Sequence, residues 1–267
     1  MKILLTGASG FVGERILRTY KESIIISPSL RNMSEDDIRR LVHDSGADAI
    51  IHTAAISAIP ACEADPDASY YANVLIPVCL AKAAGNIKLV CFSSDQVYSG
   101  SENPGPYTED DADPSNIYSI HKLEMERRVL DICPDAVMLR AEWMYDHDCS
   151  RSTYFSIVNE AEQPLSFSSS QFRGVTWRKE VADAMEQVIR LPGGIYNFGS
   201  ETDKSMYEVT REITAYLGKD VMIEDASPRH NLWMDCSKAK QAGIVFSPVM
   251  EGLKHCADES KNMCLKT

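Results

Sequence analysis

One pair of side chains in the sequence has the spacing that proton transfer from a helix face requires. Tyr118 and Lys122 are four residues apart, so a helix places them on one face. A neighbouring lysine favours the charged form of a phenol and brings tyrosine into use as a proton donor and acceptor near neutral pH. The chain has no second Tyr-x-x-x-Lys pair, and Ser94 stands upstream at the end of a predicted strand. These three are candidate catalytic residues, although a tyrosine packed under a lysine stem has the same spacing.

The start of the chain holds a second candidate, a glycine-rich segment. Residues 3–5 are apolar and predict a strand, residues 11–20 predict a helix, and Gly7, Gly10 and Gly13 mark the connection. Glycine permits a sharp turn and lets backbone N–H groups approach a pyrophosphate, and the helix N-terminus adds unpaired donors. Strand, glycine loop and helix in this order predict nucleotide binding. The alternative is an ordinary strand–turn–helix unit.

These residues need a scaffold that brings the ends of several strands together. Strands are predicted at residues 23–27, 47–53, 88–93 and 136–140, and helices at residues 36–44, 66–84 and 115–130. Repeated βα units favour an α/β fold, a doubly wound parallel sheet covered by helices on both faces. Residues 1–145 are expected to form the nucleotide-binding domain, joined by a late strand near residues 194–199. Residues 146–267 are expected to form mainly a small C-terminal substrate-binding lobe over the carboxyl ends of the strands.

Composition argues against several classes of function. The 267 residues carry a formal net charge of −12, which disfavours nucleic acid as a main partner. No apolar stretch approaches the ~20 residues of a membrane span, and the early glycine loop is unlike a signal peptide, so no membrane association is expected. The eight cysteines form no Cys-x-x-Cys pair, and the histidines lack metal-ligand spacing. We therefore expect a cytoplasmic protein without a metal site.

Longer motifs make the chain resemble the extended short-chain dehydrogenases/reductases, and within them the dTDP-4-dehydrorhamnose reductase family. The Gly-x-x-Gly-x-x-Gly spacing is typical of that superfamily. Family members carry Ser-Thr-Asp-Tyr-Val-Phe where residues 93–98 read Ser-Ser-Asp-Gln-Val-Tyr. Residues 114–126 match Pro-x-Asn-x-Tyr-Gly-x-x-Lys-x-x-x-Glu, and residues 139–145 match Leu-Arg-x-x-Trp-x-Tyr. Residues 171–176 follow Gln-x-Gly-x-Pro-Thr loosely, and residues 228–238 resemble Pro-x-Asn-x-x-Leu-x-x-x-Lys.

The resemblance spans nearly the whole chain and implies a Rossmann-type domain that works as an NAD(P)H-dependent reductase of a nucleotide-activated 4-keto sugar. By position, Ser94 would orient the substrate carbonyl, Tyr118 would protonate it, and Lys122 would hold the nicotinamide ribose and tune Tyr118. The implied cofactor-binding residues are Gly7, Ser9, Gly10, Phe11, Val12, Gly13, Arg31, Thr53, Ala54, Ala55, Ser93, Tyr118 and Lys122. The implied substrate-binding residues are Asp95, Gln96, Trp143 and Thr176.

Several positions depart from the family pattern. Gln96 replaces a tyrosine, Ser119 a glycine, Glu142 a small residue and Val175 a proline. Gln96 and Glu142 fall where the sugar is expected, so they bear on which sugar is bound. Residues 27–32 contain no acidic residue for a ribose 2′-hydroxyl, whereas Arg31 suits a 2′-phosphate. NADP(H) is therefore the preferred cofactor and NAD(H) a possible one, with a solvated loop charge as the alternative role of Arg31.

Two rival functions stay open on the sequence. One branch of the family serves as non-catalytic, NADP-binding regulatory subunits of methionine adenosyltransferase. The retained Ser94, Tyr118 and Lys122 weigh against that role, and the departures at Gln96 and Glu142 weigh for it. The other rival is a sugar-nucleotide epimerase or dehydratase, which regenerates its cofactor. The expected working unit is a monomer or a homodimer.

Overall fold

The computed structural model describes residues 1–148 and 153–264. Its main sheet contains, within those residues, β1 (Ile3–Thr6), β2 (Ile24–Ile26), β3 (Ala49–His52), β4 (Lys88–Ser94), β5 (Val137–Ala141) and β9 (Gly194–Phe198). All pairs are parallel, in the order β2-β1-β3-β4-β5-β9. The order reverses between β1 and β3, which is where open α/β sheets bind ligands. The predicted doubly wound α/β fold is confirmed.

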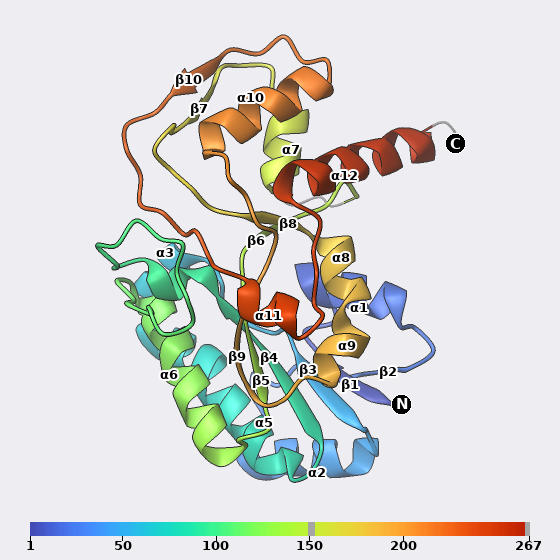
Figure 1. Ribbon diagram of the computed structural model, residues 1–267. Coiled ribbons are helices and arrows are strands. Elements are labelled where there is room, and N and C mark those ends of the chain that lie inside the picture. Colours follow the sequence, from blue (N-terminus) through green and yellow to red (C-terminus); the bar gives the residue numbers. More distant parts are fainter. Residues whose placement is uncertain (149–152, 265–267) are drawn as a thin grey trace.

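Alternation along the strands explains why helices cover both faces of the sheet (Figure 1). Ile3 and Leu5 face one side and Leu4 the other, because successive side chains of a strand point in opposite directions. One apolar core packs the sheet against α1 (Phe11–Thr19), α8 (Arg178–Asp183) and α9 (Met185–Ile189). The other packs it against α2 (Glu35–Ser45), α5 (Ile76–Ala84) and α6 (Ile117–Ile132).

The helix predicted over residues 66–84 is interrupted. It divides into α4 (Pro66–Tyr70), a π-helical turn η1 (Tyr71–Leu75) and α5. Pro77 lacks an N–H group and its ring crowds the carbonyl four residues earlier, so the regular α-helical ladder cannot run through it. A π turn before the proline absorbs this mismatch. Two short helices, α3 (Ile59–Ala64) and the 3₁₀ turn η2 (Asp95–Tyr98), follow β3 and β4.

A second lobe with its own core lies beyond the sheet (Figure 1, top). It pairs β6 (Trp143–Tyr145) with β8 (Val175–Trp177), and β7 (Leu165–Phe167) with β10 (Ile223–Asp225). Its helices are α7 (Tyr154–Asn159), α10 (Met206–Tyr216) and α12 (Val249–Cys264), while α11 (Ser237–Gln241) contacts β9. The chain enters this lobe three times, because α8, α9 and β9 return to the sheet after the first passage and α11 returns to it after the second.

Arg178, which is 2% exposed, joins the lobe to α1. Its guanidinium donates to the Phe11 carbonyl at 2.7 Å and to Glu14 at 3.1 Å. On the lobe side it donates to Asp146 at 2.9 Å and to Asp148 at 2.6 Å. The N-terminal turn of α1 is thereby held against the lobe. Within the described residues, no helix is long and apolar enough to cross a membrane.

Candidate active site

A cavity of about 730 Å³ lies at the carboxyl ends of β1, β3, β4 and β5, between the sheet and the second lobe. It collects residues that are far apart in the sequence. Of the site residues predicted from sequence, those that line it are Gly7, Ser9, Gly10, Phe11, Val12, Thr53, Ala54, Ala55, Ser93, Ser94, Asp95, Gln96, Tyr118, Lys122 and Trp143. Gly13, Arg31 and Thr176 are not part of the lining formed by the described residues.

The glycine turn has the shape that a pyrophosphate needs. Gly7 has φ of +76°, and a Cβ there would lie 2.6 Å from the Ala54 nitrogen. A Cβ at Gly13 would lie 2.1 Å from the Gly7 carbonyl oxygen, so Gly13 supports the turn from below. Gly10 is the N-cap of α1 and has no side-chain cap among the described residues. The first N–H groups of α1 are thus available to an anion at the cavity edge.

The segment after β3 runs along the cavity and is fixed at both ends. The Thr53 hydroxyl donates to the Thr6 carbonyl at 2.8 Å. Asn73 accepts from the Ile56 N–H at 3.0 Å and donates to the Ile56 carbonyl at 2.9 Å. The backbone of residues 53–56 therefore has a defined position beside the glycine turn.

Ser94, Tyr118 and Lys122 meet at one wall of the cavity. Ser94 ends β4, and the other two lie on α6, whose N-terminus is closed by an Asn116 capping box. The Lys122 Nζ donates to the Phe92 carbonyl at 2.8 Å and lies 5.8 Å from the centre of the Tyr118 ring. Tyr118 and Lys122 are 7% and 2% exposed, so both groups act in a site that largely excludes water.

The pKa of Tyr118 shifts in the direction opposite to the one expected from the sequence. Burial raises the pKa of the Tyr118 phenol above its ordinary value, and the hydrogen bond with Ser94 offsets only part of that rise. The net shift is therefore opposite to the expected lowering, because burial dominates and the Lys122 ammonium donates its hydrogen bond to the Phe92 carbonyl rather than to the phenol. Burial also lowers the pKa of Lys122, to about 8. Tyr118 is therefore protonated at neutral pH, as a proton donor must be.

The opposite wall contains Arg173, which the sequence did not single out. Its Nη2 lies 2.6 Å from Asp95 Oδ2, and its guanidinium lies 5.4 Å from the centre of the Trp143 ring. The only sequence signal was an arginine at the third position of the motif over residues 171–176, where the family pattern has glycine. Trp143 is partly buried and lines the cavity.

Three predicted residues lie outside the lining, each for its own reason. Thr176 is fully buried, donates to Glu142 Oε2 at 2.7 Å and accepts from the Ser200 N–H at 2.9 Å, so it supports the wall rather than facing the cavity. Gly13 packs beneath Gly7. Arg31 is exposed in the loop after β2. Ser93 reaches the cavity, but its hydroxyl is hydrogen-bonded to Glu126.

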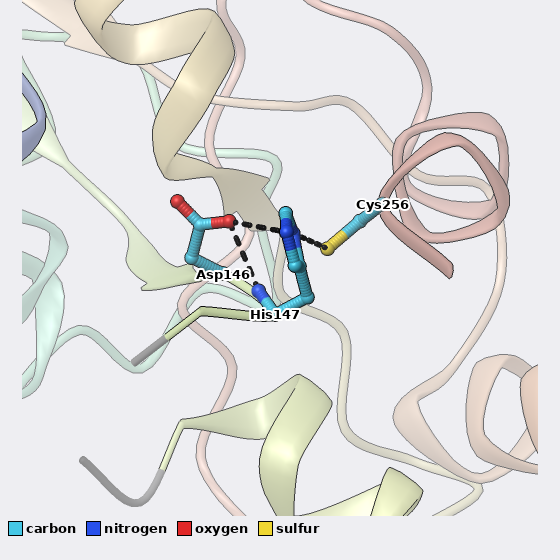
Figure 2. A group of neighbouring side chains, drawn as sticks. All are labelled: Asp146, His147 and Cys256. Atoms are coloured by element: carbon cyan, nitrogen blue, oxygen red, sulfur yellow. Dashed lines mark hydrogen bonds and ion pairs between the residues drawn. The ribbon is translucent and has the colours of Figure 1, made fainter. Parts of the chain in front are cut away.

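A group of potential metal ligands, drawn in Figure 2, is not part of the cavity lining formed by the described residues. Within the described residues Asp146, His147 and Cys256 bring one ligand atom each within 4.8 Å of one another. Asp146 already accepts hydrogen bonds from Arg178 and, at 3.1 Å, from the Trp177 Nε1–H. Burial raises the pKa of the Cys256 thiol far above its ordinary range. The contacts tie the end of β6 to α12.

Comparison with known proteins agrees with this geometry. Residues 1–261 match the family described as the RmlD substrate binding domain. The chain belongs to this family. The resemblance to dTDP-4-dehydrorhamnose reductases is confirmed at the level of the family.

The proteins that this chain is similar to carry several different functional names. The spore coat polysaccharide biosynthesis protein SpsK of Bacillus subtilis is 29% identical, over 83% of this chain and 81% of its own. Methionine adenosyltransferase 2 subunit beta of Mus musculus is 27% identical, over 95% of this chain and 86% of its own. The dTDP-4-dehydrorhamnose reductase of Bacillus anthracis, solved in complex with NADP, superposes with a TM-score of 0.83 at 21% identity, over 97% of this chain and 99% of its own.

Proposed function

We propose that this member of the family is an NADPH-dependent reductase of a nucleotide-activated 4-keto sugar, of the kind represented by dTDP-4-dehydrorhamnose. The observation that carries the proposal is the meeting of Ser94, Tyr118 and Lys122 at a cavity whose other end is the glycine turn. One end of the cavity offers backbone donors for a pyrophosphate, and the other offers a phenol, a hydroxyl and an ammonium for carbonyl chemistry.

The chain's own residues account for the proton in such a reduction. The glycine turn would hold a nicotinamide cofactor, which would supply hydride to the carbonyl carbon and leave negative charge on the carbonyl oxygen. Tyr118, protonated at neutral pH, donates its phenolic proton to that oxygen. Ser94 donates a hydrogen bond to the same oxygen and fixes its position. Lys122, held by the Phe92 carbonyl, places a positive charge beside the phenol and stabilises the phenolate that forms.

The proposal also includes the preferred cofactor, the cellular compartment and the oligomeric state. NADPH is preferred over NADH, because residues 27–32 offer the cation of Arg31 and no carboxylate. The B. anthracis relative, solved with NADP, supports this choice. We place the protein in a reducing cytoplasm, because the cysteines at positions 62, 79, 91, 133, 236 and 256 are free. We further propose that it works as a monomer or homodimer.

A regulatory role is the second candidate, favoured by one observation. The methionine adenosyltransferase 2 subunit beta of Mus musculus is 27% identical over 95% of this chain, so the similarity to a regulatory subunit includes both the sheet and the lobe. Such a protein would bind NADP and a partner enzyme without turning over a sugar. The catalytic wall weighs against this role, since Ser94 and Tyr118 would have no chemistry to perform in a subunit that turns over no sugar.

The deciding experiment is a spectrophotometric assay of NADPH oxidation with a panel of nucleotide 4-keto sugars, dTDP-4-dehydrorhamnose among them. Turnover that requires both NADPH and a 4-keto sugar supports the reductase. An absence of turnover across the panel, together with NADP-dependent binding of a methionine adenosyltransferase, would replace it with the regulatory role.

A further inference from the structure

Glu142 is a carboxyl in the wall of the cavity that the proposed proton transfer does not use. It is 6% exposed and stands between β5 and β6, where the family pattern has a small residue. An isolated buried carboxylate is costly, so such a group is either paired or neutral. The hydrogen-bond partners of the Glu142 carboxyl therefore decide whether it offers a ligand a donor or an acceptor.

One oxygen of Glu142 is fully engaged and the other is free. Oε2 accepts from the Thr176 hydroxyl at 2.7 Å and from the Ser200 N–H at 3.0 Å. Within residues 1–148 and 153–264, Oε1 has no hydrogen-bond partner. The same atom keeps some solvent-accessible surface. Because both acceptor sites of Oε2 are filled, a proton on this carboxyl belongs on Oε1.

The surrounding backbone fixes the position of this carboxyl. A Cβ at Gly174 would lie 2.1 Å from Oε1, and a Cβ at Gly199 would lie 2.2 Å from the carboxyl carbon. Side chains at either position would collide with Glu142. The two glycines leave a slot that the carboxyl head fills, with Thr176 and Ser200 holding its inner oxygen.

The charged and titratable groups that face Glu142 favour its neutral form. Burial raises its pKa to about 8; the hydrogen bond from Thr176 opposes the rise, and the Asp95 carboxylate on η2 adds to it. Arg173, just before β8, opposes the rise as well, but its guanidinium is already paired with Asp95. The Cys236 thiol beside α11 has a pKa well above its ordinary value and stays neutral. At neutral pH Glu142 thus offers an O–H donor.

We propose that Glu142 is a specificity-determining residue, whose Oε1–H donates a hydrogen bond to a hydroxyl or ring oxygen of the sugar in a nucleotide sugar. The substrate class this selects is a neutral, hydroxylated sugar. An anionic sugar group at that place would lie near the Asp95 carboxylate, which disfavours a further negative charge there. The inference rests on the proposed function, because it assigns Oε1 to the same substrate.

The test separates recognition of the sugar from recognition of the nucleotide. Calorimetric dissociation constants are measured for dTDP-rhamnose and for dTDP, with NADP⁺ present, at pH values well below and well above 8. The wild-type protein should lose up to about tenfold in affinity for dTDP-rhamnose at the higher pH, the worth of one hydrogen bond, and keep its affinity for dTDP. Glu142→Gln retains a donor and cannot ionise, so it should bind dTDP-rhamnose tightly at both pH values. Glu142→Ala should bind it weakly at both, and exposed Glu162→Gln should behave as wild type.

Opposite results would overturn the assignment. An equal pH effect on dTDP removes Glu142 from sugar recognition even if NADPH oxidation with the 4-keto sugar is normal. Glu142→Gln binding as weakly as Glu142→Ala overturns the O–H donor and would instead show that an ionised Glu142 accepts hydrogen bonds from the sugar. Failure of both dTDP and dTDP-rhamnose to bind would overturn the proposed function and this inference together.

Discussion

The two walls of the cavity are built in different ways. The nucleotide wall, formed by residues 7–12 with Ser94, Tyr118 and Lys122, depends on backbone geometry and on short, fixed spacings along β1–α1 and α6. The lobe wall, formed by Glu142, Trp143 and Arg173, depends on buried side chains that only the tertiary fold brings together. Under the proposed function, local spacing places the reacting groups, whereas packing between the lobe and the sheet places the residues that would choose the substrate.

The largest expected effect comes from the proton donor in the nucleotide wall. Tyr118→Phe removes one oxygen and should lower turnover by roughly 10²–10⁴-fold, because general acid catalysis contributes about that much. NADPH affinity and the melting temperature should change little. The measurement is kcat in the NADPH oxidation assay, with exposed Tyr216→Phe as the matched control. Turnover near the wild-type value would remove Tyr118 from the chemistry.

The next expected effect concerns the glycine turn. Gly10→Val should weaken NADPH binding by about 100-fold or more, since a β-branched side chain blocks the approach of a pyrophosphate to the backbone. The same change should leave binding of dTDP intact, because the lobe wall is untouched. Fluorescence titration with NADPH and with dTDP, on protein of native circular dichroism, measures both. Equal loss for the two ligands would mean that the walls are not separate.

Lys122→Met tests the nucleotide wall through the pH dependence of protein stability. The folded-state pKa of Lys122, about 8, lies below its ordinary 10.5, so folding disfavours the charged form. The wild-type protein should therefore gain stability as the pH rises from below 8 toward 10.5. At pH values below 8 Lys122→Met should be more stable by roughly 1–3 kcal/mol, at 1.36 kcal/mol per pKa unit, while losing turnover and NADPH affinity. Urea unfolding at several pH values, with Lys21→Met as the exposed control, measures this, and a destabilised Lys122→Met would contradict it.

Trp143→Ala tests the lobe wall. Removing the ring that lies beside Arg173 should raise the KM for the sugar nucleotide about tenfold, because a large stacked surface is lost. NADPH affinity should stay within about twofold of wild type, a change under 0.5 kcal/mol. Steady-state kinetics with each ligand varied separately shows the split. A parallel loss for cofactor and sugar would assign Trp143 to the fold rather than to the substrate.

The smallest expected effect belongs to Arg31. Arg31→Ala should weaken NADPH binding by several-fold and leave NADH binding nearly unchanged, because one exposed ion pair with phosphate is worth about 1 kcal/mol. Arg39→Ala, an exposed arginine on α2, serves as the control. If both cofactors lose affinity equally, Arg31 does not discriminate between them.

Local patterns account for most of the sheet and of the nucleotide wall. The strand predicted at residues 88–93 is β4 at Lys88–Ser94, and the first strand ends at Thr6. Apolar runs and glycine spacing carry this information within a few residues. The break before Pro77 was missed because the apolar pattern continues across it.

The lobe wall could not be predicted in the same way. The strands β6 and β8 have three residues each, too few for a periodic signal. Arg173 meets Asp95, which stands 78 residues away in the chain, so no local motif records the pair. Thr176 was assigned to the substrate by its position in a motif, but position in a motif does not fix which way a side chain points.

Arg178 has a consequence for how such a protein can be divided. One buried guanidinium satisfies the Phe11 carbonyl of the nucleotide-binding part and two aspartates of the lobe. Cutting the chain after Tyr145 would put the Phe11 carbonyl and Glu14 on one fragment and Arg178 with both aspartates on the other. The bonds that Arg178 donates to α1 would be lost, and a buried hydrogen-bonding group left without its partner costs about 1–3 kcal/mol. The lobe is therefore no interchangeable cap, and a new sugar specificity has to arise by substitution within the wall rather than by exchange of the whole lobe.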